Sequence, residues 1–433
     1  SQEYVLETAP ERILQFGEGN FLRGFADYFI DLLNERLGFH SKVAVVQPIE
    51  RGLAQEINRQ DGLYQLYLRG IENGRQINRR RLISCIGRAI NPYTDFEAFL
   101  LTAHNPDMRF ILSNTTEAGI IFDPNCNFDD APPESFPAKL TRLLFERFTA
   151  FEKAEGYVIL SCELIDNNGA ELKKHVLQHA DRWKLGREFS DWVQNENIFC
   201  STLVDRIVTG YPKEEAERLN SENGYEDVLL DTAEAFGLWV IEGPASLENE
   251  LPFAEAGLPV IFTEDHTPYK RRKVRILNGA HTSSVLAAYL YGETIVRGCM
   301  EDPVISQLIH RTVFEEIIPT LSLPEEELKE FANAVMERFR NPYIDHRLLD
   351  ISLNSVSKWN ARVKPTMTDF YHKYLSLPPF ITFSFSAMMA FYCGTEFRDG
   401  HLVGHRGDEG YPIQDSPEVL KFFAENCDKL SSR

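Results

Sequence analysis

The segment RILQFGEGNFLRG, residues 12–24, decides the fold class of this chain. Its apolar run Arg12–Phe16 stops at a glycine, and apolar residues then recur at near-helical spacing. A glycine-rich turn between a strand and a helix lets the backbone approach a pyrophosphate, whose charge then lies at the positive end of the helix dipole. Gly17 and Gly19 supply this turn, whereas Leu22 occupies the third fingerprint position, where a glycine is expected. On this pattern alone, a dinucleotide site and an ordinary tight turn are equally good interpretations.

A second apolar run, Lys42–Gln47, has the length of a strand and ends before a proline. Dinucleotide sites usually carry an acid near this point, which binds the adenosine ribose. Glu50 and Arg51 lie just beyond Gln47. Glu50 favours NAD, whereas Arg51 would accept a 2′-phosphate, and we expect NAD as the cofactor.

Two later runs, at 109–113 and 157–161, are also continuously apolar through their middles. Strands that are buried on both faces have this pattern, so we expect an α/β layer structure with a parallel sheet. Asn114, Thr115 and Glu117 follow the first of these runs. Since ligands bind at the carboxyl ends of the strands in such sheets, these side chains are expected to face the cofactor. They could equally cap the next helix, and the two roles are compatible.

The pattern changes near residue 265. Beyond Thr267 we predict no further strands, and helical periodicity continues to the end, interrupted by Pro and Gly signals. The sequence therefore predicts an α/β half over residues 1–265 and a mainly α-helical half over 266–433.

The segment KRRKVRILNGAHTSS, residues 270–284, carries the strongest signal for chemistry. If it is helical, Asn278 and His281 lie three apart on one face, and Lys273 precedes Asn278 by five positions. A lysine, an amide and an imidazole could then converge on one oxygen-bearing substrate. The alternative is a basic first turn followed by a capping Asn and a packed His.

Composition narrows the function classes. The chain has 45 Lys+Arg against 65 Asp+Glu and a formal net charge of −20, which argues against nucleic acid or an anionic membrane as partner. No apolar stretch reaches the ~18 residues of a membrane span, and the first residues lack the features of a signal peptide. The seven cysteines include no CxxC pair, so we expect a cytoplasmic protein without a disulfide framework. No pattern specifies an oligomeric state.

We expect no resident metal, because no set of His, Cys and carboxylate residues has clear ligand spacing. His175 and His179 lie four apart with Glu171 one turn earlier. The basic residues around them suggest an exposed helix face rather than a metal site.

Three motifs, taken in order, resemble those of the polyol-specific long-chain dehydrogenases, the mannitol dehydrogenase family. They are Gly17-x-Gly19-x-Phe21-x-Arg23, Thr202-x-Val204-Asp205-Arg206-Ile207 and Lys273-x4-Asn278-x2-His281. The likeness spans nearly the whole chain, and the last two motifs are specific. It implies a Rossmann-like NAD-binding domain over residues 1–265 and a mainly α-helical domain over 266–433 that binds substrate and carries the catalytic residues. It also implies NAD(P)-dependent, metal-independent hydride transfer between a secondary alcohol and a ketone.

The resemblance also implies roles for individual residues. Lys273 would be the general acid/base, and Asn278 and His281 would hold the reacting oxygen and a neighbouring hydroxyl. A buried ammonium near other cations titrates below its ordinary pKa, which suits this task. The cofactor would be bound by Gly17, Gly19, Asn20, Phe21, Arg23, Gln47, Glu50, Asn114, Thr115 and Glu117.

The sequence departs from the mannitol branch of this family after the strand that ends at Ser161. That branch has Cys-Asp-Asn, whose Asn completes the oxyanion hole, whereas this chain has Cys162-Glu163-Leu164. Leu164 cannot donate a side-chain hydrogen bond, so we expect Glu163 or Asn168 to take over part of the role in binding substrate.

The Cys-Glu-Leu-Ile pattern is most similar to the branch that interconverts D-tagaturonate and D-altronate in hexuronate breakdown. Such a sugar acid carries a carboxylate, and the segment 341–358 resembles the family's substrate-binding segment. It offers Arg347 and Lys358, which could grip the carboxylate. Without the resemblance, both would be interpreted as surface charges.

Other interpretations stay open. Within the enzyme class they are a fructuronate reductase, acting on the D-mannonate pair, and a mannitol or arabinitol dehydrogenase. A non-catalytic dinucleotide-binding sensor is the alternative from another class, although all three residues of the lysine motif are present.

Overall fold

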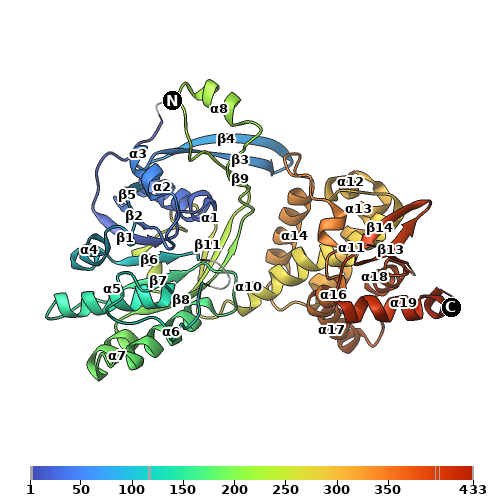
Figure 1. Cartoon of the computed structure of the whole chain (residues 1–433). Coiled ribbons are helices and arrows are strands. Elements are labelled where there is room, and N and C mark those ends of the chain that lie inside the picture. Colours follow the sequence, from blue (N-terminus) through green and yellow to red (C-terminus); the bar gives the residue numbers. More distant parts are fainter. Residues whose placement is uncertain (1–2, 116–118, 395, 399, 432–433) are drawn as a thin grey trace. The chain divides into compact units, whose positions relative to one another are not determined.

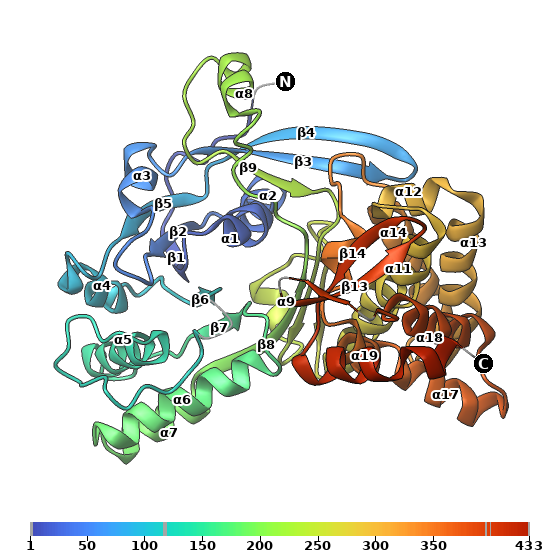
Figure 2. The ribbon, with the colours of Figure 1, turned by 45° about the vertical axis from the view of Figure 1, so that its right-hand side comes forward.

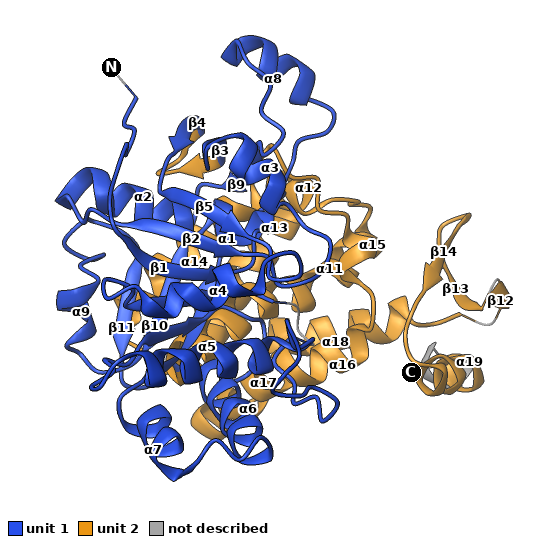
Figure 3. Cartoon of the chain, turned by 60° about the vertical axis from the view of Figure 1, so that its left-hand side comes forward, with its two compact units in different colours: residues 1–69, 77–266 blue, residues 70–76, 267–433 orange. Residues whose placement is uncertain are grey.

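The computed structural model describes residues 3–115, 119–394, 396–398 and 400–431 (Figure 1). The chain forms two compact units, coloured separately in Figure 3. Unit 1 comprises residues 1–69 and 77–266, and unit 2 comprises 70–76 and 267–433. Each unit is described by itself below.

Unit 1 is built on an eight-stranded sheet with the order β11-β10-β8-β7-β6-β1-β2-β5. All neighbouring strands pair in parallel except β8 and β10, which are antiparallel. This confirms the Rossmann-like α/β prediction. The strands are β1 Glu11–Phe16, β2 Lys42–Val46, β5 Ile86–Ile90, β6 Phe110–Ser113, β7 Val158–Ser161, β8 Ile198–Asp205, β10 Leu238–Glu242 and β11 Val260–Thr263.

The register of three central strands places their carboxyl ends level with one another. Phe16 of β1 is opposite Val46 of β2 and Ser113 of β6. The residues that follow these strands therefore emerge at the same edge of the sheet, where a parallel sheet binds its ligand. The segments predicted to bind the cofactor follow β1, β2 and β6, so they lie at this edge.

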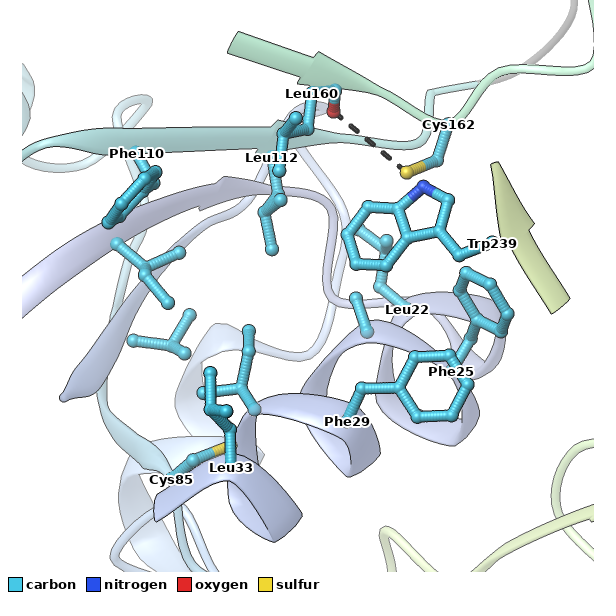
Figure 4. Packing of buried hydrophobic residues seen from close by; sticks show 14 of the residues in the cluster. Leu22, Phe25, Phe29, Leu33, Cys85, Phe110, Leu112, Leu160, Cys162 and Trp239 are labelled. Carbon is cyan, nitrogen blue, oxygen red and sulfur yellow. Dashed lines mark hydrogen bonds between the residues drawn. The ribbon is translucent and has the colours of Figure 1, made fainter. Parts of the chain in front are cut away.

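Helices cover both faces of this sheet, and each face has its own apolar core. On one face Phe25 packs between Phe29 and Trp239, and Trp239 is fully buried, as Figure 4 shows. Truncating a buried aromatic side chain of this kind costs about 3–5 kcal/mol of stability. The covering helices include α1 Asn20–Gly24, α2 Ala26–Leu37, α5 Phe136–Ala150, α6 Asn168–Arg182 and α7 Arg187–Asn195. The shorter α3 Ala54–Arg59, α4 Phe96–Leu101, α8 Ala216–Asn223 and α9 Leu247–Glu250 complete unit 1.

A second sheet contains a long hairpin whose tip belongs to unit 2. Its strands are β3 Tyr64–Glu72, β4 Arg75–Ile83 and β9 Asp231–Glu234, and the hairpin is prominent in Figure 2. Asn73 and Gly74 both have positive φ, as the tightest hairpin turns require. Within unit 2 the Gly74 amide donates to Glu337 Oε1 at 2.7 Å.

Unit 2 is mainly helical, as predicted, around the apolar helix α11 Gly279–Tyr291, which is buried along most of its length. Neighbours of α11 in the fold include α13, α15, α16 and α18. The helices are α10 Thr267–Arg272, α12 Val296–Glu301, α13 Pro303–Arg311, α14 Glu325–Phe339, α15 Leu348–Ile351, α16 Ser355–Arg362, α17 Lys364–Tyr374, α18 Pro379–Phe391 and α19 Pro417–Ser431. The π-helical segments η2 Lys273–Asn278 and η3 Thr312–Ile317 interrupt them.

The prediction of no strands beyond Thr267 is wrong. Unit 2 contains an antiparallel sheet of β12 Glu396–Arg398, β13 His401–Arg406 and β14 Glu409–Ile413. The two longer strands alternate only weakly and contain Gly and Pro, so their pattern is that of a loop. They pair because the turn at Gly407, with φ +61°, brings them together, and because Tyr411 packs against Tyr289 of α11.

None of the helices in the described part of the chain is both long and apolar enough to cross a bilayer.

Candidate active site

The carboxyl edge of the unit 1 sheet holds a cavity of about 490 Å³. It lies where the turns after β1, β2 and β6 meet. Its lining comprises Gly17, Glu18, Gly19, Pro48, Ile49, Leu53, Asn114, Thr115, Gly119, Ile121, Asp123, Glu134, Ser135 and Phe136. Four residues predicted to bind the cofactor, Gly17, Gly19, Asn114 and Thr115, are therefore brought together.

The two glycines of the turn have different requirements. Gly17 has φ +124°, and a Cβ there would lie 3.1 Å from the Asn114 carbonyl oxygen. Gly19 has φ −67° and precedes α1 with open space beside it. The fold thus needs a glycine at position 17, whereas at position 19 the absence of a side chain leaves the backbone accessible to a ligand.

Arg23, Asn20 and Phe21 support this turn and do not line the cavity. Arg23 is buried, and its guanidinium donates to the carbonyl oxygens of Glu18 and Leu229 and to Asn20 Oδ1. Phe21 stacks on Phe25, with ring centroids 5.1 Å apart. Their predicted contact with the cofactor stays a prediction.

Gln47 and Glu50 border a second cavity, of about 780 Å³, on the far side of the β2 loop. The Gln47 amide nitrogen donates to the carbonyl oxygens of Ile49 and Glu50, both at 2.9 Å, and its oxygen accepts from the Ala54 amide at 3.2 Å. Gln47 therefore holds the loop, while Glu50 and Arg51 are exposed at the cavity rim. Residues of the types that bind an adenosine ribose therefore lie beside this cavity.

The turn after β6 is anchored by Glu163. Its carboxylate accepts from Ser113 Oγ at 3.1 Å and from the amide and hydroxyl of Thr115 at 3.0 and 3.1 Å. Asn114 Nδ2 donates to the Cys162 carbonyl oxygen at 2.6 Å. Burial raises the pKa of the Glu163 carboxyl, which these hydrogen bonds partly offset. The predicted residue Glu117 lies outside the described residues.

Asn168 is buried, and its side chain is fully occupied. Its Nδ2 donates to the carbonyl oxygens of Glu163 and Thr202, and its Oδ1 accepts from the amides of Gly169 and Thr202. Leu164, in contrast, is 67% exposed. The structure gives Glu163 and Asn168 supporting contacts inside unit 1, and their predicted contact with substrate stays a prediction.

The lysine motif of unit 2 lies on one continuous helix, formed by α10, η2 and α11. In an α-helix each residue turns the chain by about 100°, so residues five apart point about 140° away from one another. A π-helix closes hydrogen bonds between residues five apart, which places them one turn apart. The π-helical segment spans Lys273 to Asn278, so these two residues lie on one face of the helix. His281 follows Asn278 by three positions on α11 and shares that face.

The three motif residues are half-buried. In the described part of the chain the Asn278 side chain makes no hydrogen bond, in contrast to Asn168. The His281 ring stacks on Phe339 at 4.2 Å and meets His346 edge-on at 5.4 Å. Its Nε2 is shielded from solvent and has no partner among the described residues. The described residues therefore leave the Asn278 side chain and His281 Nε2 without a hydrogen-bond partner.

Electrostatics keep His281 neutral. Burial lowers the pKa of His281 to about 3, and His346, Arg338, Arg362 and Lys358 add to this effect. A neutral imidazole can donate through one nitrogen and accept through the other, whereas the charged form can only donate. At neutral pH the ring can therefore either donate a hydrogen bond to a hydroxyl or accept one from it.

The two predicted carboxylate-binding residues lie in different surroundings. Lys358, on α16, is half-buried and donates from Nζ to the Ile351 carbonyl oxygen at 3.0 Å. Arg347 is exposed at the start of α15 and is not among the main charges that act on His281. Arg362, one turn after Lys358 on α16, is among them, and sequence reasoning missed it although the spacing of four was visible.

The expectation that the α6 histidine pair lies on an exposed helix face is wrong for His179. His179 is fully buried between the rings of Phe122 and Trp183, at 4.7 and 5.0 Å. His175 hydrogen-bonds to Gln178 Oε1 at 2.6 Å. Within the described residues the group with three closely spaced potential metal ligands is Glu242, Asp265 and His266, in unit 1. There His266 Nδ1 lies 2.5 Å from Glu242 Oε2, so a hydrogen bond joins two of the three.

Comparison with known proteins gives consistent matches along the chain. The model of the mannitol dehydrogenase Rossmann domain matches residues 11–255, and that of the mannitol dehydrogenase C-terminal domain matches residues 265–403. The altronate oxidoreductase of Klebsiella pneumoniae (strain 342) is 50% identical over 414 residues, which cover 95% of this chain and 84% of that protein. The altronate oxidoreductase of Escherichia coli O7:K1 is 48% identical over 419 residues, with 96% and 85% covered.

Solved structures share the fold at lower identity. A D-sorbitol dehydrogenase in substrate-free form superposes with a TM-score of 0.82 at 22% identity, covering 97% of this chain and 87% of that chain. The mannitol 2-dehydrogenase of Pseudomonas fluorescens, solved with NAD and D-mannitol, gives 0.68 at 23% identity, covering 99% and 87%.

Proposed function

Because this chain belongs to the mannitol dehydrogenase family, we propose that it is an NAD-dependent oxidoreductase that interconverts D-altronate and D-tagaturonate. Membership confirms the resemblance found in the three motifs. The observation that carries the choice of substrate is the identity of about 50% to altronate oxidoreductases over 95% of the chain.

The residues of unit 1 fit a dinucleotide. A Cβ at position 17 would press on the Asn114 carbonyl oxygen, so the turn is built for glycine, and the open space at Gly19 admits a phosphate. Glu50 lies at the rim of the neighbouring cavity, where an acid favours the ribose of NAD. When bound, NAD accepts the hydride of the alcohol, and NADH returns it to the ketone.

Lys273 is the proposed general acid/base. In the oxidation direction its Nζ takes the hydroxyl proton as hydride leaves the carbinol carbon, so one alcohol yields one ketone, one hydride and one proton. In the reduction direction the ammonium returns that proton to the oxygen. General acid–base catalysis of this kind contributes about 10²–10⁴-fold to the rate.

Asn278 and His281 hold the substrate beside Lys273. The Asn278 amide donates to the same oxygen as it gains negative charge, a contribution of the oxyanion-hole kind. The neutral His281 binds a neighbouring hydroxyl through its shielded Nε2. This arrangement depends on the π-helical turn, which brings the lysine and the amide to one face.

A sugar acid also needs cations for its carboxylate. Lys358 lies in the group of charges around His281 and is a proposed carboxylate ligand. Arg347 stays a predicted ligand, on the resemblance of its segment alone.

The remaining features concern the location and the partners of the protein. We infer a cytoplasmic location, which the seven cysteines favour, since none of those in the described structure forms a disulfide. The formal charge of −20 disfavours nucleic acid and anionic membranes as partners.

The test follows NADH oxidation by absorbance with D-tagaturonate, D-fructuronate and D-fructose, each repeated with NADPH and with EDTA. We expect a strong preference for D-tagaturonate with NADH and no effect of EDTA. A preference for D-fructuronate or D-fructose would reassign the substrate within the family. Turnover that EDTA abolishes would contradict the lysine mechanism.

A further inference from the structure

Arg362 is an unusual arginine in unit 2. Its guanidinium is half-buried, yet it makes no ion pair or hydrogen bond within the described part of the chain. Other shielded arginines of this unit face carboxylates: Arg272 pairs with Glu327 at 2.6 Å, Arg275 with Asp369 at 2.7 Å and Arg297 with Asp345 at 2.8 Å. Burying a charge without a partner is costly, so an uncompensated guanidinium indicates a ligand that supplies the missing anion.

A second cation lies beside it. Lys358 precedes Arg362 by four positions on α16, so the two side chains lie on one face of the helix, where like charges repel. Burial lowers the pKa of both groups, and their mutual repulsion lowers that of Lys358 further. Asp415, an acid that acts electrostatically on Lys358, is already engaged by the Tyr392 hydroxyl at 2.6 Å and by the Val356 amide at 3.3 Å. No carboxylate among the described residues therefore bridges the pair.

The end of α16 adjoins the proposed catalytic segment. A Cβ at Gly279 would lie 3.6 Å from the Arg362 carbonyl oxygen, so this backbone packs against the residue that follows Asn278. Both Lys358 and Arg362 act electrostatically on His281. The cation pair is thus next to the groups that hold the reacting oxygen, within the same unit.

We propose that Arg362, together with Lys358, binds the carboxylate of the substrate and makes this site selective for sugar acids over neutral polyols. This inference rests on the proposed function and names Arg362, in place of Arg347, as the arginine that grips the acid. A guanidinium offers two parallel N–H donors to a carboxylate, and the ammonium adds a point charge. A neutral polyol leaves both cations without a counter-charge.

The experiment compares Arg362→Ala, Arg362→Lys and Arg347→Ala with the wild type. Steady-state rates of NADH oxidation are measured with D-tagaturonate and with the neutral ketose D-fructose, and NADH affinity is measured by fluorescence. Arg311→Ala is the matched control, because Arg311 is exposed on α13, where it pairs with Glu315 of the next turn and lies over the Phe380 ring.

We expect Arg362→Ala to lower kcat/KM for D-tagaturonate by about 10- to 100-fold, mainly through KM, since a charged hydrogen-bonded contact is lost. The value for D-fructose and the affinity for NADH should change little. Arg362→Lys should recover part of the loss, and Arg311→Ala should match the wild type. Equal losses with both substrates, or a selective loss in Arg347→Ala with none in Arg362→Ala, would overturn the proposal.

Failure of the proposed function is distinguishable from failure of this inference. If the wild type does not turn over D-tagaturonate, the proposed function fails. Calorimetric binding of D-altronate to the wild type and to Arg362→Ala then decides the inference. Weaker binding to the variant supports it, and equal binding or no binding to either protein refutes it.

Discussion

Asn278 follows Lys273 by five residues, and the π-helical hydrogen bonding between them places the two on one face of the helix. A regular α-helix would turn them about 140° apart. π-helical turns are rare in proteins, in keeping with the cost of irregular hydrogen bonding. Those that do occur are often found at functional sites. Under the proposed function, this irregularity lets one helix present both the general acid/base Lys273 and the proposed oxyanion ligand Asn278.

Asn278→Ala should lower kcat by about 10²- to 10³-fold while KM changes little, because the lost amide acts mainly on the charge that develops in the transition state. Lys273→Ala should lose as much or more and still bind NADH. Steady-state kinetics and NADH fluorescence measure the two effects. A purely structural role for Asn278 would show instead as a fall in the melting temperature that accompanies the loss of rate.

Gly17→Ala should weaken NADH binding and lower the free energy of unfolding by about 1–3 kcal/mol. The reason is that alanine is strained at φ +124° and its Cβ meets the Asn114 carbonyl oxygen. Gly19→Ala is the control for stability alone, since its φ of −67° suits alanine and no atom lies nearby. Thermal unfolding with and without NADH gives both quantities. Equal destabilisation by the two variants would contradict the assigned difference between the glycines.

Stability should fall as the pH drops from 7 towards 5, partly because of His179. Burial lowers the pKa of His179 to about 4 in the folded chain, whereas the unfolded chain has the ordinary value of about 6.5. Between these values the unfolded state binds a proton that the folded state does not, so acid favours unfolding by about 2 kcal/mol at pH 5.

Urea unfolding of His179→Met at pH 7 and pH 5 tests whether His179 contributes to the loss of stability in acid. The variant should lose less stability on acidification than the wild type does. His104→Gln, which alters an exposed histidine, should behave like the wild type. An unchanged pH dependence in His179→Met would show that other groups account for the fall.

Asn168→Ala should lower the free energy of unfolding by about 2–4 kcal/mol, because four hydrogen-bonding partners inside unit 1 lose their counterpart. Leu164→Ala, in the same loop, should be nearly neutral because that side chain is 67% exposed. Urea unfolding separates these outcomes. If Asn168 binds substrate instead, KM will rise in the alanine variant while stability stays near that of the wild type.

The Rossmann-like sheet was predictable because its central strands are buried on both faces. Such strands are continuous apolar runs, and β1, β2, β6 and β7 all lie where those runs predicted them. The glycine turn could also be located, since it depends on neighbouring residues along the chain. The candidate catalytic residues were then predicted from the motifs that resemble those of the family.

Features that depend on distant contacts could not be predicted in this way. The strands β13 and β14 pair through one glycine turn and through packing on α11, neither of which alters their loop-like composition. The π-helical turn leaves the spacing of Lys273 and Asn278 unchanged in the sequence. Arg362 was overlooked because an arginine at a helix end is ordinary until the missing counter-charge around it is known.

The hairpin tip at residues 70–76 makes the polypeptide cross from one unit to the other at three peptide links: 69–70, 76–77 and 266–267. No single cut in the gene can therefore release either half intact. A fragment that starts at Thr267 would lack the Gly74 amide, which donates a hydrogen bond to Glu337. The other fragment would keep the hairpin tip, which belongs to unit 2. The two halves are consequently poor candidates for independent exchange by recombination, and a swap between relatives would have to carry seven residues from near the start of the chain along with the distant half.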